Sequence, residues 1–353
     1  MQKRIEWIKK SLTTCLTACL AGGLLFSGCA GRGGEKVNEI QIGVVVYDEY
    51  DTFISQLMNE FMEDVSEQIK NGKRISVKRY NAAGNQITQN EQVEEMIEKG
   101  CNVICVNLVD RTDPSMIIEA ARKADIPVIF FNRELVEKDL MSWDKLYYVG
   151  ADAFESGIMQ GQIAADAWFE NLETDRTLDK NGDGCLQYVV LEGEAGHQDS
   201  IVRSEYSVNA LVDAGIQVDK CESSIANWSR AQAQTKMAQL LNKYGDTIEL
   251  LLCNNDDMAL GAIDEMKAQS IPREKWPVVV GIDGTDVGLE AVVNGDMLGT
   301  VYNNKEGQAR AMLQLAIYAV TGEGYEKLEL EDGKYIRFPY MRVTNENIGE
   351  FTE

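Results

Sequence analysis

The sequence predicts an α/β protein with two similar lobes, each a doubly wound parallel sheet with helices on both faces. Short β-branched runs alternate with segments whose apolar residues recur at helical spacing, which is typical of parallel-sheet proteins. This alternation occurs twice, on either side of Tyr147–Gly150. The chain has 353 residues, enough for two domains, and a hydrophobic content of 44% that is ordinary for a globular protein.

The first series begins with the β-branched run Ile40–Tyr47, which predicts a buried strand. A helix is predicted over Asp51–Lys70, because its apolar residues fall at helical spacing. Gly100 is expected to end a later helix. The remaining elements of this series are predicted as strands at Ile75–Tyr80, Cys101–Val109 and Ile126–Phe131, and helices at Gln92–Lys99 and Ser115–Ala124.

The second series repeats the same alternation and ends in a looser tail after Val320. Its predicted helices are Glu155–Asn171, Arg203–Ala214, Ser229–Tyr244, Met258–Gln269, Val287–Asn294 and Gly307–Val320. Its predicted strands are Leu186–Leu191, Ile216–Cys221, Ile248–Leu252, Val278–Ile282 and Leu298–Val301.

Residues 1–28 predict a secretory signal peptide, because a basic head precedes the mostly apolar stretch Leu12–Phe26. The segment Leu25–Cys29 resembles a lipoprotein cleavage site, at which Cys29 becomes the lipid-modified N-terminus. Residues 29–37 then predict a flexible, glycine-rich tether. Removing the four basic and one acidic side chain of residues 1–28 takes the formal net charge from −23 to −26. So acidic a chain repels nucleic acid and anionic lipid surfaces.

The mature part contains five cysteines besides Cys29, an odd number, and most lie in apolar runs. They are predicted to be buried free thiols rather than a disulfide framework. With one histidine in the chain, no zinc-type pattern of cysteine and histidine exists. The five are Cys101, Cys105, Cys185, Cys221 and Cys253.

A calcium-type loop is predicted ahead of the Leu186–Leu191 run. Oxygen-bearing side chains occupy its positions 1, 3, 5 and 9, and a glycine at position 6 permits the sharp turn. The candidate ligands are Asp179, Asn181, Asp183, the Cys185 carbonyl and Gln187. Position 12 is Val190 instead of the usual glutamate. The last carboxylate therefore comes from elsewhere in the chain, or the loop is only a polar turn.

Polar side chains recur just after the predicted strands, where ligand sites of open α/β sheets lie. They include the sole histidine, His197, with Asp199 and Arg203 following it. Carboxylates and amides suit the hydroxyl rim of a sugar, and the aromatic planes of Phe53 and Trp228 suit its two faces. The competing interpretations are helix caps for the polar residues and core packing for the aromatic ones. The other polar residues of this set are Asp51, Asn132, Asn255, Asp283 and Asn303.

Eight segments in order along the mature chain resemble the periplasmic glucose/galactose-binding proteins. They are Tyr47–Phe53, Phe130–Glu134, Tyr147–Asp152, Asp179–Gln187, Gly193–Arg203, Asn254–Asp256, Val280–Asp283 and Gly299–Asn303. The resemblance implies a two-lobed type I periplasmic-binding-protein fold whose three-stranded hinge crosses near Gly150, Asn303 and Pro339. It also implies two domains, formed by residues 38–149 with 304–338 and by residues 150–303 with 339–353.

By the same resemblance, the sugar ligands are Asp51, Phe53 and Asn132 from one lobe and six residues from the other, with Asn303 at the hinge. The six are His197, Asp199, Arg203, Trp228, Asn255 and Asp283. Phe53 and Trp228 would sandwich the pyranose. A structural Ca²⁺ would take the predicted loop, with Glu249 as the missing bidentate ligand.

The function implied by the resemblance is capture of D-galactose or D-glucose and its delivery to an ABC transporter permease. The protein would be an extracytoplasmic, lipid-anchored, non-enzymatic monomer. One alternative is a sensor of the same fold that presents sugar to a membrane histidine kinase or chemoreceptor. A second alternative is a glycosidase that uses Asp51 and Asp283 as paired carboxylates.

Overall fold

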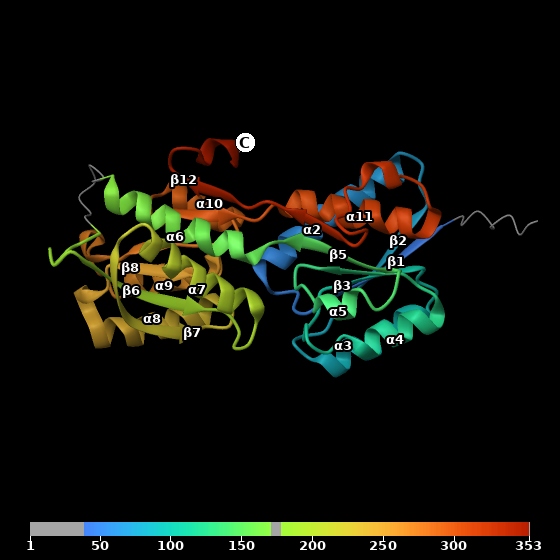
Figure 1. Ribbon diagram of the computed structural model, residues 1–353, viewed down its shortest axis with the longest axis horizontal. Coiled ribbons are helices and arrows are strands. Elements are labelled where there is room, and N and C mark those ends of the chain that lie inside the picture. Colours follow the sequence, from blue (N-terminus) through green and yellow to red (C-terminus); the bar gives the residue numbers. More distant parts are fainter. Residues whose placement is uncertain (1–38, 171–177, 353) are drawn as a thin grey trace, which may run out of the picture. The chain divides into compact units, whose positions relative to one another are not determined.

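The computed structural model describes residues 39–170 and 178–352 (Figure 1). The predicted signal peptide, Cys29 and the tether lie outside these described residues. Residues Glu39–Glu353 form one compact unit. This unit contains two six-stranded sheets, each with helices on both faces, as the sequence predicts. Within the described residues, no helix combines the length and the apolar character needed to cross a membrane.

The first sheet is entirely parallel, with the strand order β11-β5-β4-β3-β1-β2. Its strands are β1 (Ile40–Val46), β2 (Ile75–Asn81), β3 (Val103–Val106), β4 (Val128–Phe131), β5 (Leu146–Ala151) and β11 (Tyr335–Phe338). The near-continuous apolar runs of β1, β3 and β4 follow from burial on both faces.

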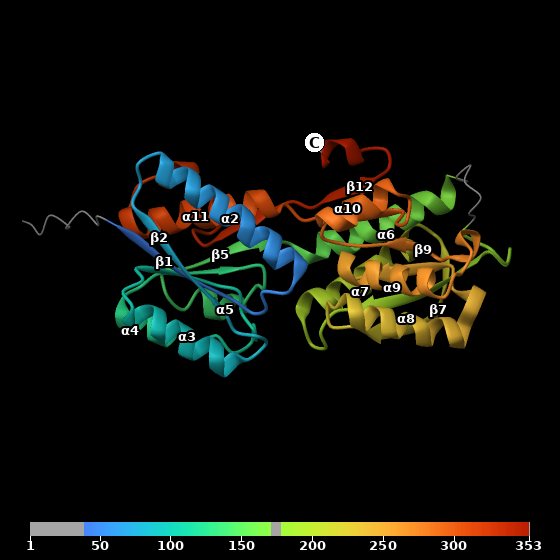
Figure 2. The same cartoon turned by 180° about the vertical axis from the view of Figure 1, so that it is seen from behind.

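Two helix pairs cover the first sheet (Figure 2). On one face α2 (Thr52–Lys70) and α11 (Lys305–Thr321) pack into a core that includes Leu57, Phe61 and Met312. On the other face lie α3 (Gln86–Glu98) and α4 (Ser115–Ala124), whose buried residues include Val93 and Ile117. The short α5 (Glu137–Leu140) precedes β5 and was not predicted.

The second sheet has the order β12-β10-β9-β8-β6-β7, and only β12 is antiparallel to its neighbour. Its strands are β6 (Cys185–Glu192), β7 (Gln217–Ile225), β8 (Leu250–Cys253), β9 (Val278–Val280), β10 (Gly299–Tyr302) and β12 (Met341–Thr344). The helices α6 (Ala153–Phe169) and α7 (Gln198–Asp213) share the core on one face. The helices α8 (Arg230–Tyr244), α9 (Asp256–Ala268) and α10 (Asp286–Val293) contribute to the core on the other. Short 3₁₀ turns occur at Gly245–Thr247, Arg273–Lys275, Tyr325–Lys327 and Ile348–Glu350.

Read from the second strand, the strands of both lobes follow the same order, 2-1-3-4-5, with a sixth strand added at the far edge. The chain passes between the sheets three times: from β5 to α6, from β10 to α11 and from β11 to β12. These passages lie at the three places where the hinge was predicted. The fold is therefore the two-lobed type I arrangement that the sequence indicates.

Two helices begin five or six residues earlier than predicted, each at a capping residue that the sequence pattern did not reveal. The helix α3 begins at Gln86 rather than Gln92, since the side chain of Asn85 accepts a hydrogen bond from the Thr88 backbone. The helix α7 begins at Gln198 rather than Arg203, with His197 as its N-cap. The five described cysteines are all free, as predicted, although Cys185 and Cys221 are only partly buried.

Candidate functional site

A cleft lined by residues of both lobes brings together nine of the ten predicted sugar ligands. The lining residues pack closely and enclose a cavity of about 30 Å³. They are Tyr47, Asp51, Phe53, Ile54, Asn132, Arg133, His197, Asp199, Arg203, Trp228, Asn255 and Asp283. The tenth predicted ligand, Asn303, does not line the cleft. It is buried behind it, with its backbone N–H donating to the Asp283 carbonyl and its side chain accepting from Gln308.

The cleft lies where two sheets of this topology are expected to bind ligands. In the order 2-1-3-4-5 the connections after the first and third strands leave in opposite directions, and the ends of these strands form a crevice. Tyr47 and Asp51 follow β1 in the first lobe. In the second lobe His197 follows β6, and Asn255 follows β8. Both crevices contribute to the one cleft.

In the first lobe, Asp51 combines two roles. Its Oδ1 accepts from the Ile54 backbone at 2.9 Å, which makes it the N-cap of α2, and its Oδ2 accepts from the Tyr47 hydroxyl at 2.6 Å. Burial and the Asp51 charge raise the pKa of Tyr47, so the phenol keeps its proton and remains the donor. The guanidinium of Arg133 lies 3.6 Å from the centre of the Tyr47 ring. These contacts fix the direction of the Asp51 carboxylate.

Asn132 is held from behind by a second amide. The Nδ2 of Asn107, fully buried after β3, donates to Asn132 Oδ1 at 3.1 Å and to the Phe131 carbonyl at 3.2 Å. The hydroxyl of Tyr148 donates to the Asn132 carbonyl at 2.8 Å. Since Asn132 Oδ1 already accepts, its amide group is oriented as a donor toward the cleft.

In the second lobe, His197 is a neutral histidine with an assigned tautomer. Its Nδ1 accepts from the Asp199 backbone N–H at 3.1 Å, so the ring proton is on Nε2. Burial lowers the pKa of His197 to about 4, more than the neighbouring Asp199 carboxylate raises it. His197 therefore offers the cleft an uncharged N–H donor at neutral pH.

Arg203 brings a buried positive charge to the cleft, with an exposed fraction of 3%. Its Nη1 donates to the Asn254 carbonyl at 2.7 Å and lies 3.4 Å from Asp283 Oδ1. Its Nη2 donates to the Tyr340 hydroxyl and lies 3.7 Å from Asp199. Burial raises the pKa of Asp283 well above its usual range, against the effect of Arg203. Arg203 Nε is buried and has no hydrogen-bond partner among the described residues, so it is an unused donor at the cleft.

Trp228 occupies its position because Gly193 has no side chain. A β-carbon at Gly193 would overlap the six-membered ring of the indole. The His197 ring packs edge-to-face against the indole with centroids 5.2 Å apart, and Asn255 Nδ2 donates to the Trp228 carbonyl at 3.3 Å. Asn255 is also the N-cap of α9, accepting from the Met258 backbone at 3.0 Å.

Backbone strain is concentrated at the cleft. Asn132, Trp228 and Asp283 have φ values of 60°, 61° and 113°, and Asn227 beside Trp228 has 51°. A bulky tryptophan in this region of φ is uncommon, and each such residue costs on the order of 1–3 kcal/mol. Strain of this kind persists where surrounding contacts impose it, and it is typical of ligand sites.

Two polar contacts join the lobes beside the cleft. Arg133 Nη2 pairs with Glu194 Oε2 at 3.1 Å, and Thr52 Oγ1 donates to Asp257 Oδ2 at 2.6 Å. Arg133 is 4% exposed, so its charge is largely removed from water. Arg133, Tyr47 and Ile54 line the cleft but were not predicted as ligands. Arg133 directly follows Asn132. A basic residue next to a predicted ligand was therefore the signal that the sequence offered.

The predicted calcium loop and Glu249 also come together. Glu249 is 1% exposed, and its carboxylate accepts from the backbones of Lys180, Asn181 and Gln187 at 2.6, 3.3 and 3.1 Å. Burial raises the pKa of Glu249, and these three hydrogen bonds oppose the rise. Asn181 Nδ2 donates to Asp183 and to Gln187. Among the described residues no three carboxylate, thiolate or imidazole groups converge tightly enough to hold a metal by themselves.

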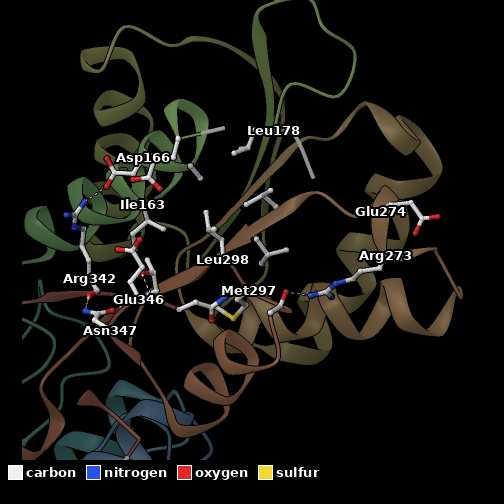
Figure 3. Close-up of a pocket in the computed structure, with 17 residues that line it drawn as sticks. Ile163, Asp166, Leu178, Arg273, Glu274, Met297, Leu298, Arg342, Glu346 and Asn347 are labelled. Carbon is white, nitrogen blue, oxygen red and sulfur yellow. Dashed lines mark hydrogen bonds and ion pairs between the residues drawn. The ribbon is translucent and has the colours of Figure 1, made fainter. Parts of the chain in front are cut away.

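A larger cavity of about 770 Å³ lies within the second lobe (Figure 3). Its walls are largely aliphatic, including Ile163, Leu178 and Leu298. Two ion pairs lie at its edge: Arg342 contacts Asp166, and Arg273 contacts Asp296, both at 2.6 Å. None of the ten predicted sugar ligands lines this cavity, so it is the weaker candidate for a sugar.

Comparisons with known proteins agree with this geometry. The family model described as "Periplasmic binding protein domain" matches residues 42–324. The D-galactose/methyl-galactoside binding periplasmic protein of Haemophilus influenzae is 35% identical over 315 residues, covering 88% of this chain and 91% of that protein. A xylitol-binding protein of Mycolicibacterium smegmatis is 29% identical, covering 87% and 80%.

Among solved structures, an ABC transporter solute binding protein from Bacillus halodurans with bound myo-inositol superposes with a TM-score of 0.73. It is 27% identical, and the match covers 90% of this chain and 99% of that one. The family model and the Haemophilus relative each span most of the sequence, and the fold is the one that both imply. This chain therefore belongs to the periplasmic binding protein family.

Proposed function

We propose that the interlobe cleft binds D-galactose or D-glucose and that the protein delivers the sugar to an ABC transporter permease. The observation that carries this proposal is the convergence of nine polar and aromatic side chains, which the sequence had selected for sugar chemistry, on one cleft between two lobes. Amides and carboxylates serve hydroxyl groups, and Phe53 with Trp228 supplies apolar faces. The galactose-binding relative at 35% identity supports the choice of hexose.

Binding would act through hinge closure. A sugar that contacts residues of both lobes stabilises the closed arrangement by its differential affinity, and a permease recognises that arrangement. The Arg133–Glu194 and Thr52–Asp257 contacts belong to this arrangement. Members of the family are non-enzymatic components of transport, and this chain is a binding protein rather than an enzyme.

Calorimetry with purified protein tests the sugar. D-galactose, D-glucose, D-allose, xylitol and myo-inositol form a panel that varies the ring hydroxyls and the ring itself. We expect micromolar or tighter binding of galactose or glucose and much weaker binding of the two polyols. Tight binding of xylitol or myo-inositol, with none of either hexose, would contradict the proposal.

We also propose that the loop binds a structural Ca²⁺ with Asp179, Asn181, Asp183, the Cys185 carbonyl, Gln187 and Glu249. These residues fit a calcium site because all offer hard oxygen atoms, and calcium takes 6–8 of them. Glu249 supports the fit, since it is a carboxylate buried against this loop. In the bound form the ion would crosslink the loop to the segment before β8, and none of these residues lines the sugar cleft.

A lipid anchor on Cys29 is the third part of the proposal. The predicted signal peptide and the cleavage-like segment Leu25–Cys29 support it, and membership of a periplasmic family supports a location outside the cytoplasm. Expression of Cys29→Ser should release the protein from the membrane fraction or leave it unprocessed. A variant of mature size that fractionates with the membrane as the wild type does would refute the anchor.

A further inference from the structure

Asp256 is a fully buried carboxylate directly after the cleft residue Asn255, at the start of α9. It does not line the cleft. Its Oδ2 accepts from the Thr285 backbone at 2.8 Å and from the Thr285 hydroxyl at 3.1 Å. Its Oδ1 accepts from the Thr300 hydroxyl at 2.6 Å. One side chain thus joins α9, the turn after β9 and the strand β10.

The hydrogen bonds around the two threonines have a defined direction. Thr300 Oγ1 accepts from the Gly284 backbone at 3.3 Å, and Thr285 Oγ1 accepts from the Gly288 backbone at 3.2 Å. Because each hydroxyl oxygen receives an N–H, its own proton is directed to Asp256. Three donors therefore converge on the Asp256 carboxylate. Burial raises the pKa of Asp256, against these hydrogen bonds, to about 7.

The turn between β9 and α10 packs directly on Asp256. A β-carbon at Gly281 or at Gly288 would overlap the Asp256 carboxylate oxygens, so both positions need a residue without a side chain. Asp283 lies between these two glycines and has a φ of 113°. Its backbone N–H donates to the Val301 carbonyl at 2.8 Å. The segment that presents Asp283 to the cleft is therefore held by Asp256 on one side and by β10 on the other.

We propose that Asp256 is a positioning residue of the cleft, which holds the 281–285 turn and so keeps Asp283 in its strained, cleft-facing conformation. The inference rests on the proposed sugar binding, because its effect on function passes through Asp283. If one of these three hydrogen bonds to Asp256 is removed, the 281–285 turn is held less firmly. The turn would then relax toward ordinary φ values.

A matched pair of variants at Thr300, which is fully buried, tests the proposal. Thr300→Val keeps the shape and removes the donor, whereas Thr300→Ser keeps the donor. We expect Thr300→Val to weaken binding of D-galactose and D-glucose about tenfold by calorimetry, the worth of one hydrogen bond to a charged group. Thr300→Ser should bind within about twofold of the wild type. If Thr300 acted through its shape alone, Thr300→Val would be the better tolerated of the two variants.

Amide hydrogen exchange without sugar separates this inference from the proposed function. In Thr300→Val, exchange should accelerate at Thr285, whose N–H donates to Asp256, and remain unchanged in β8, while Thr300→Ser should exchange as the wild type does. Gly284 does not serve as the readout, because its own N–H donates to Thr300 and loses its acceptor in Thr300→Val. If the wild type binds neither hexose, the proposed function fails, and this exchange comparison still decides the role of Asp256. Unchanged exchange at Thr285, or faster exchange across the whole second sheet, would overturn it. Asp256→Asn, with the same expected pattern, replaces Thr300→Val if that variant does not fold.

Discussion

The two lobes share one strand order, yet they bring different chemistry to the cleft. The first lobe presents Asp51, which is held as the N-cap of α2, and Asn132, whose side chain accepts from Asn107. Its aromatic residue, Phe53, is part of the core of the same lobe. The second lobe presents a buried arginine between two carboxylates, a neutral histidine and a tryptophan in a strained conformation. Buried charge and unfavourable φ occur in both lobes, but the second lobe has more of them: Arg203, Trp228 and Asp283, against Arg133 and Asn132 in the first.

This difference indicates a division of roles. A site that is strained and desolvated before ligand arrives is preorganised, and it loses little freedom on binding. We infer that the second lobe provides most of the sugar affinity and that the first lobe completes the site on closure. Variants at equivalent positions of the two lobes test this division directly.

The largest expected effect comes from the two carboxylates. Asp283→Asn replaces an acceptor oxygen beside Arg203 with an amide donor, and losing the hydrogen-bond partner of a buried charge costs on the order of 2–5 kcal/mol, so sugar affinity should fall roughly 100-fold or more. Asp51→Asn keeps an N-cap and a partly exposed acceptor and should cost about tenfold. Calorimetry of both variants is the measurement. Equal losses, or a larger loss at Asp51, would contradict the division of roles.

The next effect concerns the proposed calcium loop, which belongs to the second lobe. Calcium at a hundredfold excess over its Kd should stabilise the wild type by about 2.7 kcal/mol, visible as a higher melting temperature than with chelator. Magnesium should restore less of it, because it prefers a smaller octahedral site. Glu249→Gln should lose most of the calcium response and keep the wild-type sugar affinity. A wild type that melts equally with calcium and with chelator would show that the loop is only a polar turn.

A smaller effect separates the two aromatic residues. Trp228→Ala should reduce sugar affinity by about 1–3 kcal/mol, or roughly 10- to 100-fold, with little change in melting temperature, since the indole is only partly buried. Phe53 is 5% exposed and part of the first-lobe core, so Phe53→Ala should lower the melting temperature as well as the affinity. Thermal melts and tryptophan fluorescence titrations would measure both. Unchanged affinity in Trp228→Ala would return Trp228 to a packing role.

The smallest effect is the pH response of His197. Its pKa is lowered to about 4 in the folded protein, against roughly 6.5 in the unfolded chain, so the unfolded state binds the proton first. The contribution of His197 is fully present above about pH 6.5 and is lost as pH falls toward 4. At pH 5.5 the loss should be about 1 kcal/mol. His197→Asn keeps an N-cap and does not titrate, so its melting temperature should fall less between pH 7 and pH 5.5. Parallel pH profiles for the two proteins would exclude this role.

Much of the fold was predictable because its signals are local. The helix Ser115–Ala124 has the predicted limits, and β1 and α2 differ from their predicted limits by one residue, since apolar spacing and β-branched runs mark them clearly. The starts of α3 and α7 were missed, because Asn85 and His197 look like ordinary polar residues until their capping hydrogen bonds are seen. β11 and β12 were missed because they are short and each joins a sheet formed by distant residues.

The sequence predicted most of the residues that line the cleft, but not the contacts and backbone conformations that hold them. Polar residues after strands, together with the family resemblance, selected nine of the residues that converge. No sequence pattern indicated that Arg133 contacts Glu194 across the cleft, or that Trp228 and Asp283 have positive φ. Such features depend on contacts between segments far apart in the chain. Gly193 shows this well, since its role is visible only once the indole of Trp228 is placed against it.

The connection between β11 and β12 affects the order in which this chain can fold. These consecutive strands lie at the edges of different sheets, and only residues 339 and 340 separate them. The first sheet therefore leaves β5 with an open edge until residues 335–338 have been synthesised, after five of the six strands of the second sheet. Pairings between such distant segments form slowly, and an open edge invites association with other chains. Truncation before Tyr335 would remove β11 from the first sheet and β12 from the second. A chain shortened in this way would contain neither lobe in complete form.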